Sequence, residues 1–192
     1  MQLEQAQQIA TAVFALYEKY GAADYIGEPV SQLEHMYQAA LLAEQAGATE
    51  EVILAAFFHD IGHLCEIDEK ISMDGYGVQD HEQWGSKYLQ RCGFSDTLAQ
   101  LVGSHVAAKR YLTYKHPAYY EQLSPASKQT LAFQGGPMTA TEAAAFEADP
   151  LFADMVRLRT WDDLAKATDQ PTPELSRFKQ MAIKHLLTVV SH

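Results

Sequence analysis

An apolar segment that contains a histidine and an aspartate constrains the fold of this 192-residue chain more than any other feature. Residues 52–64 read VILAAFFHDIGHL and are apolar nearly all round, which is typical of a central, buried helix. His59 and Asp60 stand inside this run, and His63 follows on the same predicted helix face as His59. Burying an ionised carboxylate beside a histidine is costly unless both are paired or bind a metal. The fold must therefore bring partners for these side chains into its centre.

Helix start signals recur along the whole chain. Residues suited to N-caps precede the predicted helices at Ser31, Thr49, Asp80, Ser95, Ser124, Thr139, Asp149 and Thr172. Ser31 and Thr139 are each followed three residues later by glutamate, the pattern of a capping box. No segment alternates convincingly with the period of two that is typical of a strand. The sequence predicts an all-α helical bundle in which residues 1–192 form a single domain.

Composition limits the partners and the compartment. The formal net charge of -11 argues against nucleic acid and anionic membranes as main partners, because both require a broad basic surface. Residues 1–10 show no signal-peptide pattern, and no apolar run approaches the length of a membrane span. Cys65 and Cys92 are typical of buried thiols in a reducing compartment, so we expect a cytoplasmic protein. His185 is interpreted as a cation near the last carbonyls of its helix.

Further histidines and an aspartate are predicted to face inward from separate helices. His35 lies near the start of its helix, and His81 directly follows the Asp80 cap. His105 continues the apolar stripe of a helix predicted to run from Ser95 through Val106. A lone histidine on an apolar face is more often a core residue than a ligand, but the ensemble predicts a buried metal site. Its candidate ligands are His35, His59, Asp60, His81, His105 and Asp162.

In their order along the chain, these residues resemble the H…HD…D pattern of the HD-domain superfamily of helical metalloproteins. Within it, the chain is similar to the small mixed-valent diiron oxygenases that cleave a carbon–phosphorus bond. These are the 2-amino-1-hydroxyethylphosphonate dioxygenases and their relatives acting on the N-trimethyl substrate. The similarity runs from Tyr25 to Asp162 and includes the motifs YIGE at 25–28, HDIGH at 59–63 and RTWD at 159–162.

The resemblance implies a cofactor of two iron ions in the Fe(II)/Fe(III) state, with dioxygen as co-substrate. One iron would bind His35, His59, Asp60 and Asp162, and the other Asp60, His81 and His105, so that Asp60 bridges. The catalytic residues implied are Tyr25, Glu28 and Asp60. Tyr25 would occupy a vacant iron position and move away when substrate enters, with Glu28 steering it. Without the family, Tyr25 is an ordinary aromatic residue at a helix end.

The resemblance also implies a small organophosphonate as the partner. Its phosphonate group would be held by His63, Lys109, Ser127, Thr130 and Arg159. Gln32, the remaining substrate-binding residue, could accept hydrogen bonds from a primary ammonium together with Glu28. Ser127 lies in the first turn after Ser124, where the helix dipole favours an anion. Ile26, which replaces a small residue of the glycine-forming enzymes, and the acidic charge favour the N-trimethyl substrate, giving glycine betaine and phosphate. The primary amine, giving glycine, is the alternative.

Two other functions use the same ligands. A metal-dependent HD phosphohydrolase would attack a phosphate ester with a metal-activated water and need no oxygen. A helical signalling module would keep the metal and admit no substrate. The phosphohydrolase predicts turnover without oxygen consumption, whereas the signalling module predicts metal binding without turnover.

Overall fold

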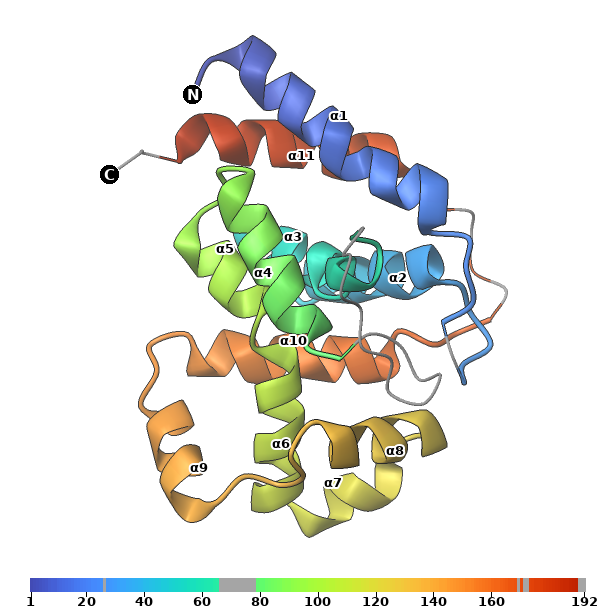
Figure 1. The fold of residues 1–192 in the computed structure, drawn as a ribbon, viewed down its shortest axis with the longest axis vertical. Helices are drawn as coiled ribbons and strands as arrows, with labels where there is room; N and C mark the ends of the chain where they lie inside the picture. The colour runs from blue at the N-terminus through green and yellow to red at the C-terminus, as the bar shows by residue number, and fades with distance from the viewer. Residues whose placement is uncertain (26, 66–78, 169, 171–172, 190–192) are drawn as a thin grey trace.

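The computed structural model describes the chain except for residues 26, 66–78, 169, 171–172 and 190–192 (Figure 1). The described residues form helices and no strand, which confirms the predicted all-α class. The elements are α1 Leu3–Tyr20, α2 Gln32–Gln45, α3 Glu50–Phe58, the 3-10 helix η1 Ile61–His63, α4 His81–Arg91, α5 Asp96–Val102, α6 His105–Lys115, α7 Pro117–Gln122, α8 Pro125–Phe133, α9 Ala140–Glu147, α10 Phe152–Leu164 and α11 Leu175–Thr188. In the part of the chain that is described, no helix combines the length and apolarity that crossing a bilayer requires.

Most of the predicted helix starts are confirmed by capping contacts. Ser31 and Thr139 form complete capping boxes with Glu34 and Glu142. Asp80 and Asp149 are exceptions. Asp80 precedes α4 in a left-handed conformation, with a φ of 56°, and its side chain makes no cap hydrogen bond. The N-cap of α10 is Leu151 rather than Asp149. The side chains of Thr49, Ser95 and Ser124 each accept a backbone N–H in the first turn of the helix that follows. The side chain of Asp149 accepts the N–H of Leu151 before α10. Thr172 lies outside the described residues.

Helix α3 lies at the centre of the molecule, as its apolar sequence predicts. It packs against α2, α5, α10 and α11, and α1 lies along α11 on the outside (Figure 1). Phe57 stacks on Phe14 of α1 and on Phe178 of α11, with ring centroids 5.5 and 4.7 Å apart. Removing such a buried ring typically costs about 3–5 kcal/mol. This aromatic cluster therefore fixes the far side of the helix whose C-terminal end carries His59 and Asp60.

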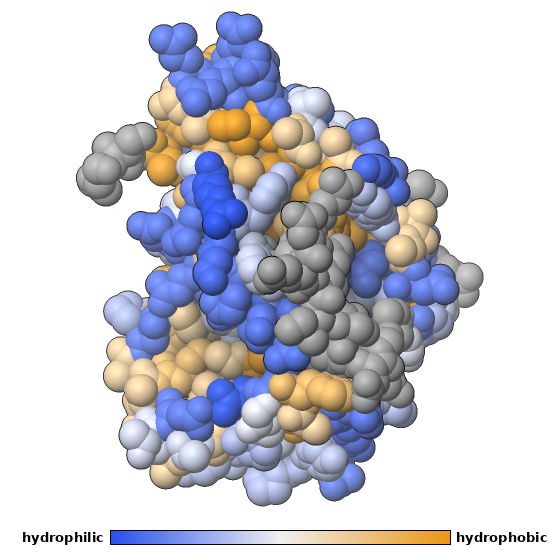
Figure 2. All heavy atoms as spheres, viewed as in Figure 1, coloured by the Kyte–Doolittle hydropathy of each residue, from blue (hydrophilic) through white to orange (hydrophobic). Residues whose placement is uncertain are grey.

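The outer face of α4 contrasts with this core. Hydrophilic residues gather over α4 in the middle of the view in Figure 2. The inward side of the same helix carries the buried residues His81, Gly85 and Leu89. The α4 sequence is therefore amphipathic, and its first residue points into the protein.

The prediction of one continuous helix over residues 52–64 is wrong. Helix α3 ends at Phe58, and Asp60, with φ −104° and ψ 12°, leads into the separate turn η1. A Cβ on Gly62 would lie 1.9 Å from the backbone oxygen of His81, so the turn passes tightly under α4. His63 consequently does not lie one helical turn beyond His59. The apolar pattern continues through the break because both segments are buried, which hides the break from a periodicity argument.

The predicted helix from Ser95 through Val106 is also two helices. Helix α5 ends at Val102, and Ser104 precedes a new helix, α6, whose first residue is His105. His105 thus does not continue the stripe of α5. Helix α7 was not predicted, because only Pro117 at its first position signals it.

His185 differs from the prediction of a cation at a helix C-terminus. Its Nε2 accepts a hydrogen bond from the backbone N–H of Ser95 at 3.3 Å, and its ring stacks on Phe94. Burial lowers the pKa of His185, although the carboxylate of Glu51 opposes this shift. The side chain is therefore a neutral acceptor that ties α11 to the start of α5.

This contact predicts a pH dependence of stability. Because the pKa of His185 is lower in the folded than in the unfolded chain, its contribution is complete above the unfolded value of about 6.5 and decreases as the pH falls below it. We expect the free energy of unfolding of His185→Gln to fall less steeply between pH 7.5 and 5 than that of the wild type. Chemical denaturation across this range measures both slopes, and equal slopes would contradict the assignment.

Candidate metal centre

Six predicted ligands from five parts of the fold lie together in the interior. They are His35 in α2, His59 and Asp60 after α3, His81 and His105 as the first residues of α4 and α6, and Asp162 near the end of α10. Each is at most 5% exposed. The structure therefore brings together all the residues that the sequence analysis selected for this site, and it uses helix ends for most of them.

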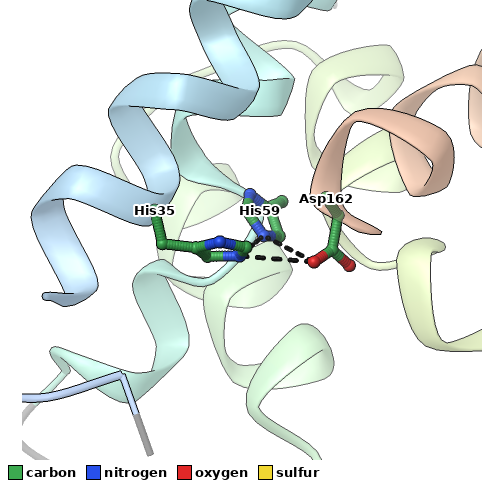
Figure 3. A group of neighbouring side chains, drawn as sticks. All are labelled: His35, His59 and Asp162. Carbon is green, nitrogen blue, oxygen red and sulfur yellow. Dashed lines mark hydrogen bonds and ion pairs between the residues drawn. The ribbon is translucent and has the colours of Figure 1, made fainter. Parts of the chain in front are cut away.

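The first group of side chains joins α2, α3 and α10. Nε2 of His35 lies 3.0 Å from Nε2 of His59 (Figure 3). Oδ1 of Asp162 lies 3.2 Å from Nε2 of His35 and 3.7 Å from Nε2 of His59. The three residues offer one donor atom each within a sphere suited to a metal ion.

Asp60 connects this group to a second one. Its Oδ1 lies 3.2 Å from Nε2 of His81 and 3.3 Å from Nε2 of His105. Its Oδ2 lies 3.5 Å from Nε2 of His35 and 3.4 Å from Nε2 of His59. One carboxylate thus divides its two oxygens between two histidine pairs, which is the arrangement a bridging ligand of a dinuclear site requires.

Hydrogen bonds from the Nδ1 atoms orient the histidine rings, so that their Nε2 atoms face the centre of the site. Nδ1 of three of these histidines lies 2.8–3.0 Å from a backbone carbonyl oxygen, to which it donates. The pairs are His35 with Ala165, His59 with Ala56, and His105 with Val102. The Nε2 lone pairs therefore point inward. The inner nitrogens of His81 and His105 approach to 2.9 Å, and two such acceptors are stable side by side only around a proton or a cation.

The charges of the site favour a cation. Burial alone would raise the pKa of Asp60, but the surrounding histidines hold it well below its usual range. Burial likewise disfavours a charge on His59, but Asp60 and Asp162 raise its pKa to about 10. A metal ion would take the place of this proton. The set of imidazole and carboxylate donors without thiolate suits iron, among other transition metals.

The carboxylate of Asp60 provides a direct test of the dinuclear arrangement. Asp60→Asn replaces one oxygen with an N–H donor that faces the histidine nitrogens, so we expect metal affinity to fall by about 10–100-fold or more. Metal content after reconstitution and dialysis measures the effect, with about two ions per chain expected for the wild type.

The partly exposed residue Asp154 offers a matched control, because among the described residues it pairs with Arg157 on α10 and does not line the cavity. Asp154→Asn should retain the metal content of the wild type. Two tightly bound ions in Asp60→Asn would show that the carboxylate does not bridge them.

A cavity of about 60 Å³ opens beside Asp60, His81 and His105. Every residue predicted for catalysis or substrate binding lines it: Tyr25, Glu28, Gln32, Asp60, His63, Lys109, Ser127, Thr130 and Arg159. Gln134 also lines it and was missed by the sequence analysis; its Oε1 is buried without a partner among the described residues. Helical spacing from Ser127 and Thr130 could have identified it.

Lys109, like Arg159, is a buried basic residue that lines this cavity. Its Nζ donates to Oγ1 of Thr130 at 2.9 Å, and its side chain comes from the second turn of α6. Burial, together with the neighbouring charge of Arg159, lowers the pKa of Lys109 to about 7. His63 lies nearby with its ring 4.0 Å from that of His81, and burial lowers its pKa well below the usual range. The cavity therefore holds a lysine that gains its charge easily when an anion enters.

Arg159 lines the same cavity and also orients a candidate ligand. Its Nη1 donates to Oδ2 of Asp162 at 2.6 Å, which leaves Oδ1 of that carboxylate for His35. The guanidinium also contacts Asp163 and the hydroxyl of Tyr119, two residues that the sequence analysis missed. Burial opposes its charge, but Asp162 and Asp163 raise the pKa of Arg159 well above its usual value. Arg159 thus stays charged at the edge of the cavity.

Tyr25 covers the first histidine group. Its ring stacks on that of His35 with centroids 3.9 Å apart. The N–H of Glu28 closes a turn onto the Tyr25 carbonyl at 2.9 Å, and Gly27 has a φ of 81°. Burial and the carboxylates of the site raise the pKa of Tyr25, which keeps its hydroxyl protonated. Ile26, which the sequence analysis singled out in this turn, lies outside the described residues.

Glu28 has a partner that the sequence analysis did not predict. Its Oε1 accepts from Nζ of Lys166 at 2.7 Å, and that nitrogen also lies 3.4 Å from Oγ of Ser124. The carboxylate therefore forms an ion pair at the rim of the cavity.

Comparisons with known proteins agree with this arrangement. The HD domain family model matches residues 33–151. An uncharacterised protein of Acanthamoeba polyphaga mimivirus is 44% identical over 96% of this chain and 84% of its own length. The glycine-betaine-forming [1-hydroxy-2-(trimethylamino)ethyl]phosphonate dioxygenase of Leisingera caerulea is 38% identical over 93% of this chain and 92% of its own. Hydroxymethylphosphonate dioxygenase of Gimesia maris is 39% identical over 88% and 83%, respectively.

Proposed function

The chain belongs to the HD-domain family, and we propose that it is a diiron dioxygenase that cleaves the carbon–phosphorus bond of a small 1-hydroxyphosphonate and releases phosphate. The observation that carries this proposal is the carboxylate of Asp60, shared between two histidine pairs beside a cavity that contains Lys109 and Arg159. The names of two relatives, both phosphonate dioxygenases, support the class of reaction.

The proposed ligand sets follow the two groups. His35, His59, Asp60 and Asp162 would hold one iron, and Asp60, His81 and His105 the other. The second set has fewer protein donors and lines the cavity, which favours substrate binding on that side. When bound, a mixed-valent iron pair supplies the electron transfer to dioxygen that amino-acid side chains cannot provide.

The side chains of the cavity would position the phosphonate. Lys109 and Thr130, which already contact each other, present a cation and a hydroxyl from α6 and α8. Ser127 lies in the first turn of α8, where the helix dipole favours an anion. Holding the phosphonate at these points would place C1 and its hydroxyl toward the second ligand set.

Tyr25 and Glu28 are proposed to control entry. The Tyr25 ring lies on His35 and lines the cavity, so its displacement would open space next to the metal ligands. The turn that carries it also carries Glu28, whose ion pair with Lys166 holds the turn in place. Movement of this turn would couple entry of the substrate to uncovering of the site.

The substituent on the substrate is the finer part of the proposal. The sequence favours the N-trimethyl substrate, which would give glycine betaine and phosphate, over the primary amine, which would give glycine and phosphate. The relative from Leisingera caerulea is named for the trimethyl compound, whereas the relative from Gimesia maris is named for hydroxymethylphosphonate. All three compounds share the C1 hydroxyl and the phosphonate.

Oxygen dependence tests the proposed reaction. The iron-loaded protein, supplied with a 1-hydroxyphosphonate, should release phosphate and consume oxygen in equal amounts, and turnover should stop without oxygen. Phosphate assay and an oxygen electrode follow the two quantities together. Release of phosphate from a phosphate ester without oxygen uptake would favour the phosphohydrolase instead.

The pKa of Lys109 predicts how activity depends on pH. Its ammonium attracts the phosphonate only when protonated, and above about pH 7 the free enzyme loses this charge. We expect kcat/KM of the wild type to decline above this pH relative to that of Lys109→Arg, which stays charged. Lys109→Met should reduce kcat/KM by about 10–100-fold, as expected for a lost charged hydrogen bond. Parallel pH profiles for the wild type and Lys109→Arg would contradict this role.

A further inference from the structure

A short segment that follows α10 holds a lysine at the rim of the cavity. Nζ of Lys166 lies 2.7 Å from Oε1 of Glu28 and 3.4 Å from Oγ of Ser124. The side chain of Glu28 is 9% exposed and that of Lys166 is 18% exposed, so the pair is largely shielded from water. Shielded ion pairs are weakened little by salt. Lys166 thus joins the turn that carries Tyr25 to the start of α8.

The backbone on both sides of Lys166 is fixed. The carbonyl oxygen of Ala165 accepts from Nδ1 of His35 at 3.0 Å. The N–H of Ala167 donates to Oε1 of Gln38, and its carbonyl accepts from Nε2 of the same amide, both at 3.0 Å. These contacts anchor the residues next to Lys166 to α2. Lys166 is therefore held in place more firmly than a lysine on a free surface loop.

The ion pair determines the charge at one end of the cavity. The cavity-lining carboxylates among the described residues are Glu28, Asp60 and Asp162. Asp60 and Asp162 face the histidine groups, which leaves Glu28 as the acid that could pair with a cationic substituent of the substrate. Lys166 already neutralises it. A substrate ammonium next to Glu28 would therefore meet a carboxylate whose charge is already neutralised, and it would gain little electrostatic attraction there.

The size of the cavity supports the same conclusion. A volume of about 60 Å³ accommodates roughly four to six water-sized groups, at about 10–15 Å³ each. A hydroxymethyl group and a phosphonate nearly fill such a space, whereas an added methylene and trimethylammonium group would extend beyond it.

We propose that Lys166 is a specificity-determining residue that disfavours cationic substituents, so that the preferred substrate is a hydroxyphosphonate without an ammonium group. This inference rests on the proposed function and replaces the preference for the N-trimethyl substrate that the sequence alone favours. A primary ammonium that pairs with Glu28 would compete with Lys166 for the same carboxylate. A trimethylammonium group lacks the N–H donors to replace the hydrogen bond that would be lost.

Three phosphonates test the proposal: hydroxymethylphosphonate, 2-amino-1-hydroxyethylphosphonate and its N-trimethyl derivative. For the iron-loaded wild type, we expect kcat/KM to be about tenfold or more higher for hydroxymethylphosphonate than for either cationic compound. Dissociation constants measured without oxygen should rank the compounds in the same order. This binding measurement separates the two proposals, because a lack of turnover with all three compounds would overturn the proposed reaction while the affinities still test the preference.

Substitution of Lys166 supplies the matched comparison. Lys166→Met removes the charge and keeps most of the chain length, so the ratio of affinities should shift about tenfold toward the cationic compounds. Lys166→Arg keeps the charge and should preserve the ranking of the wild type. An unchanged ratio in folded Lys166→Met would overturn the proposal, and so would a wild type that binds either cationic compound as tightly as hydroxymethylphosphonate. If Lys166→Met does not fold, the wild-type ranking still tests the preference for a substrate without an ammonium group.

Discussion

The carboxylate of Asp60 is the constraint on which the rest of this structure depends. It is buried at the centre of the bundle, where an unpaired negative charge would be highly unfavourable. Its two oxygens face four histidine nitrogens, two on each side. Four helices besides α3 must therefore direct a helix end or an inner face at one point: α2 and α10 for the first group, and α4 and α6 for the second. The break between α3 and η1 places this carboxylate between the two groups.

The surroundings of the centre hold its parts in position. Backbone carbonyls orient His35, His59 and His105, and Arg159 orients Asp162. The segment after α10 serves several of these contacts at once, because Ala165 binds His35 while Lys166 binds Glu28. The consecutive residues Ala165 and Lys166 thus contact both a candidate metal ligand and a residue that lines the cavity. A change at the rim can reach the metal ligands through His35 and the Tyr25 ring.

The sequence predicted the helical class, most helix starts and the full set of candidate ligands. The helical class and the helix starts are confirmed, because capping boxes are local signals. The candidate ligands lie together because a His-Asp pair within an apolar run needs buried partners, and their binding of metal stays a prediction. The breaks at His59–Asp60 and at Gly103–Ser104 were not predictable from periodicity, since buried residues continue on both sides. The pairing of Lys166 with Glu28 joins residues 138 positions apart, and no local pattern indicates it. Long-range contacts of this kind decide the charge of the rim, and hence the expected preference for the substrate.

We propose that two iron ions share the carboxylate of Asp60 next to a phosphonate site. Electron paramagnetic resonance of the partly oxidised, iron-loaded protein tests it most directly. We expect a signal from a coupled Fe(II)/Fe(III) pair, which changes when hydroxymethylphosphonate is added and is absent from Asp60→Asn. Only signals of isolated ferric ions, at every degree of oxidation and without response to the phosphonate, would contradict it.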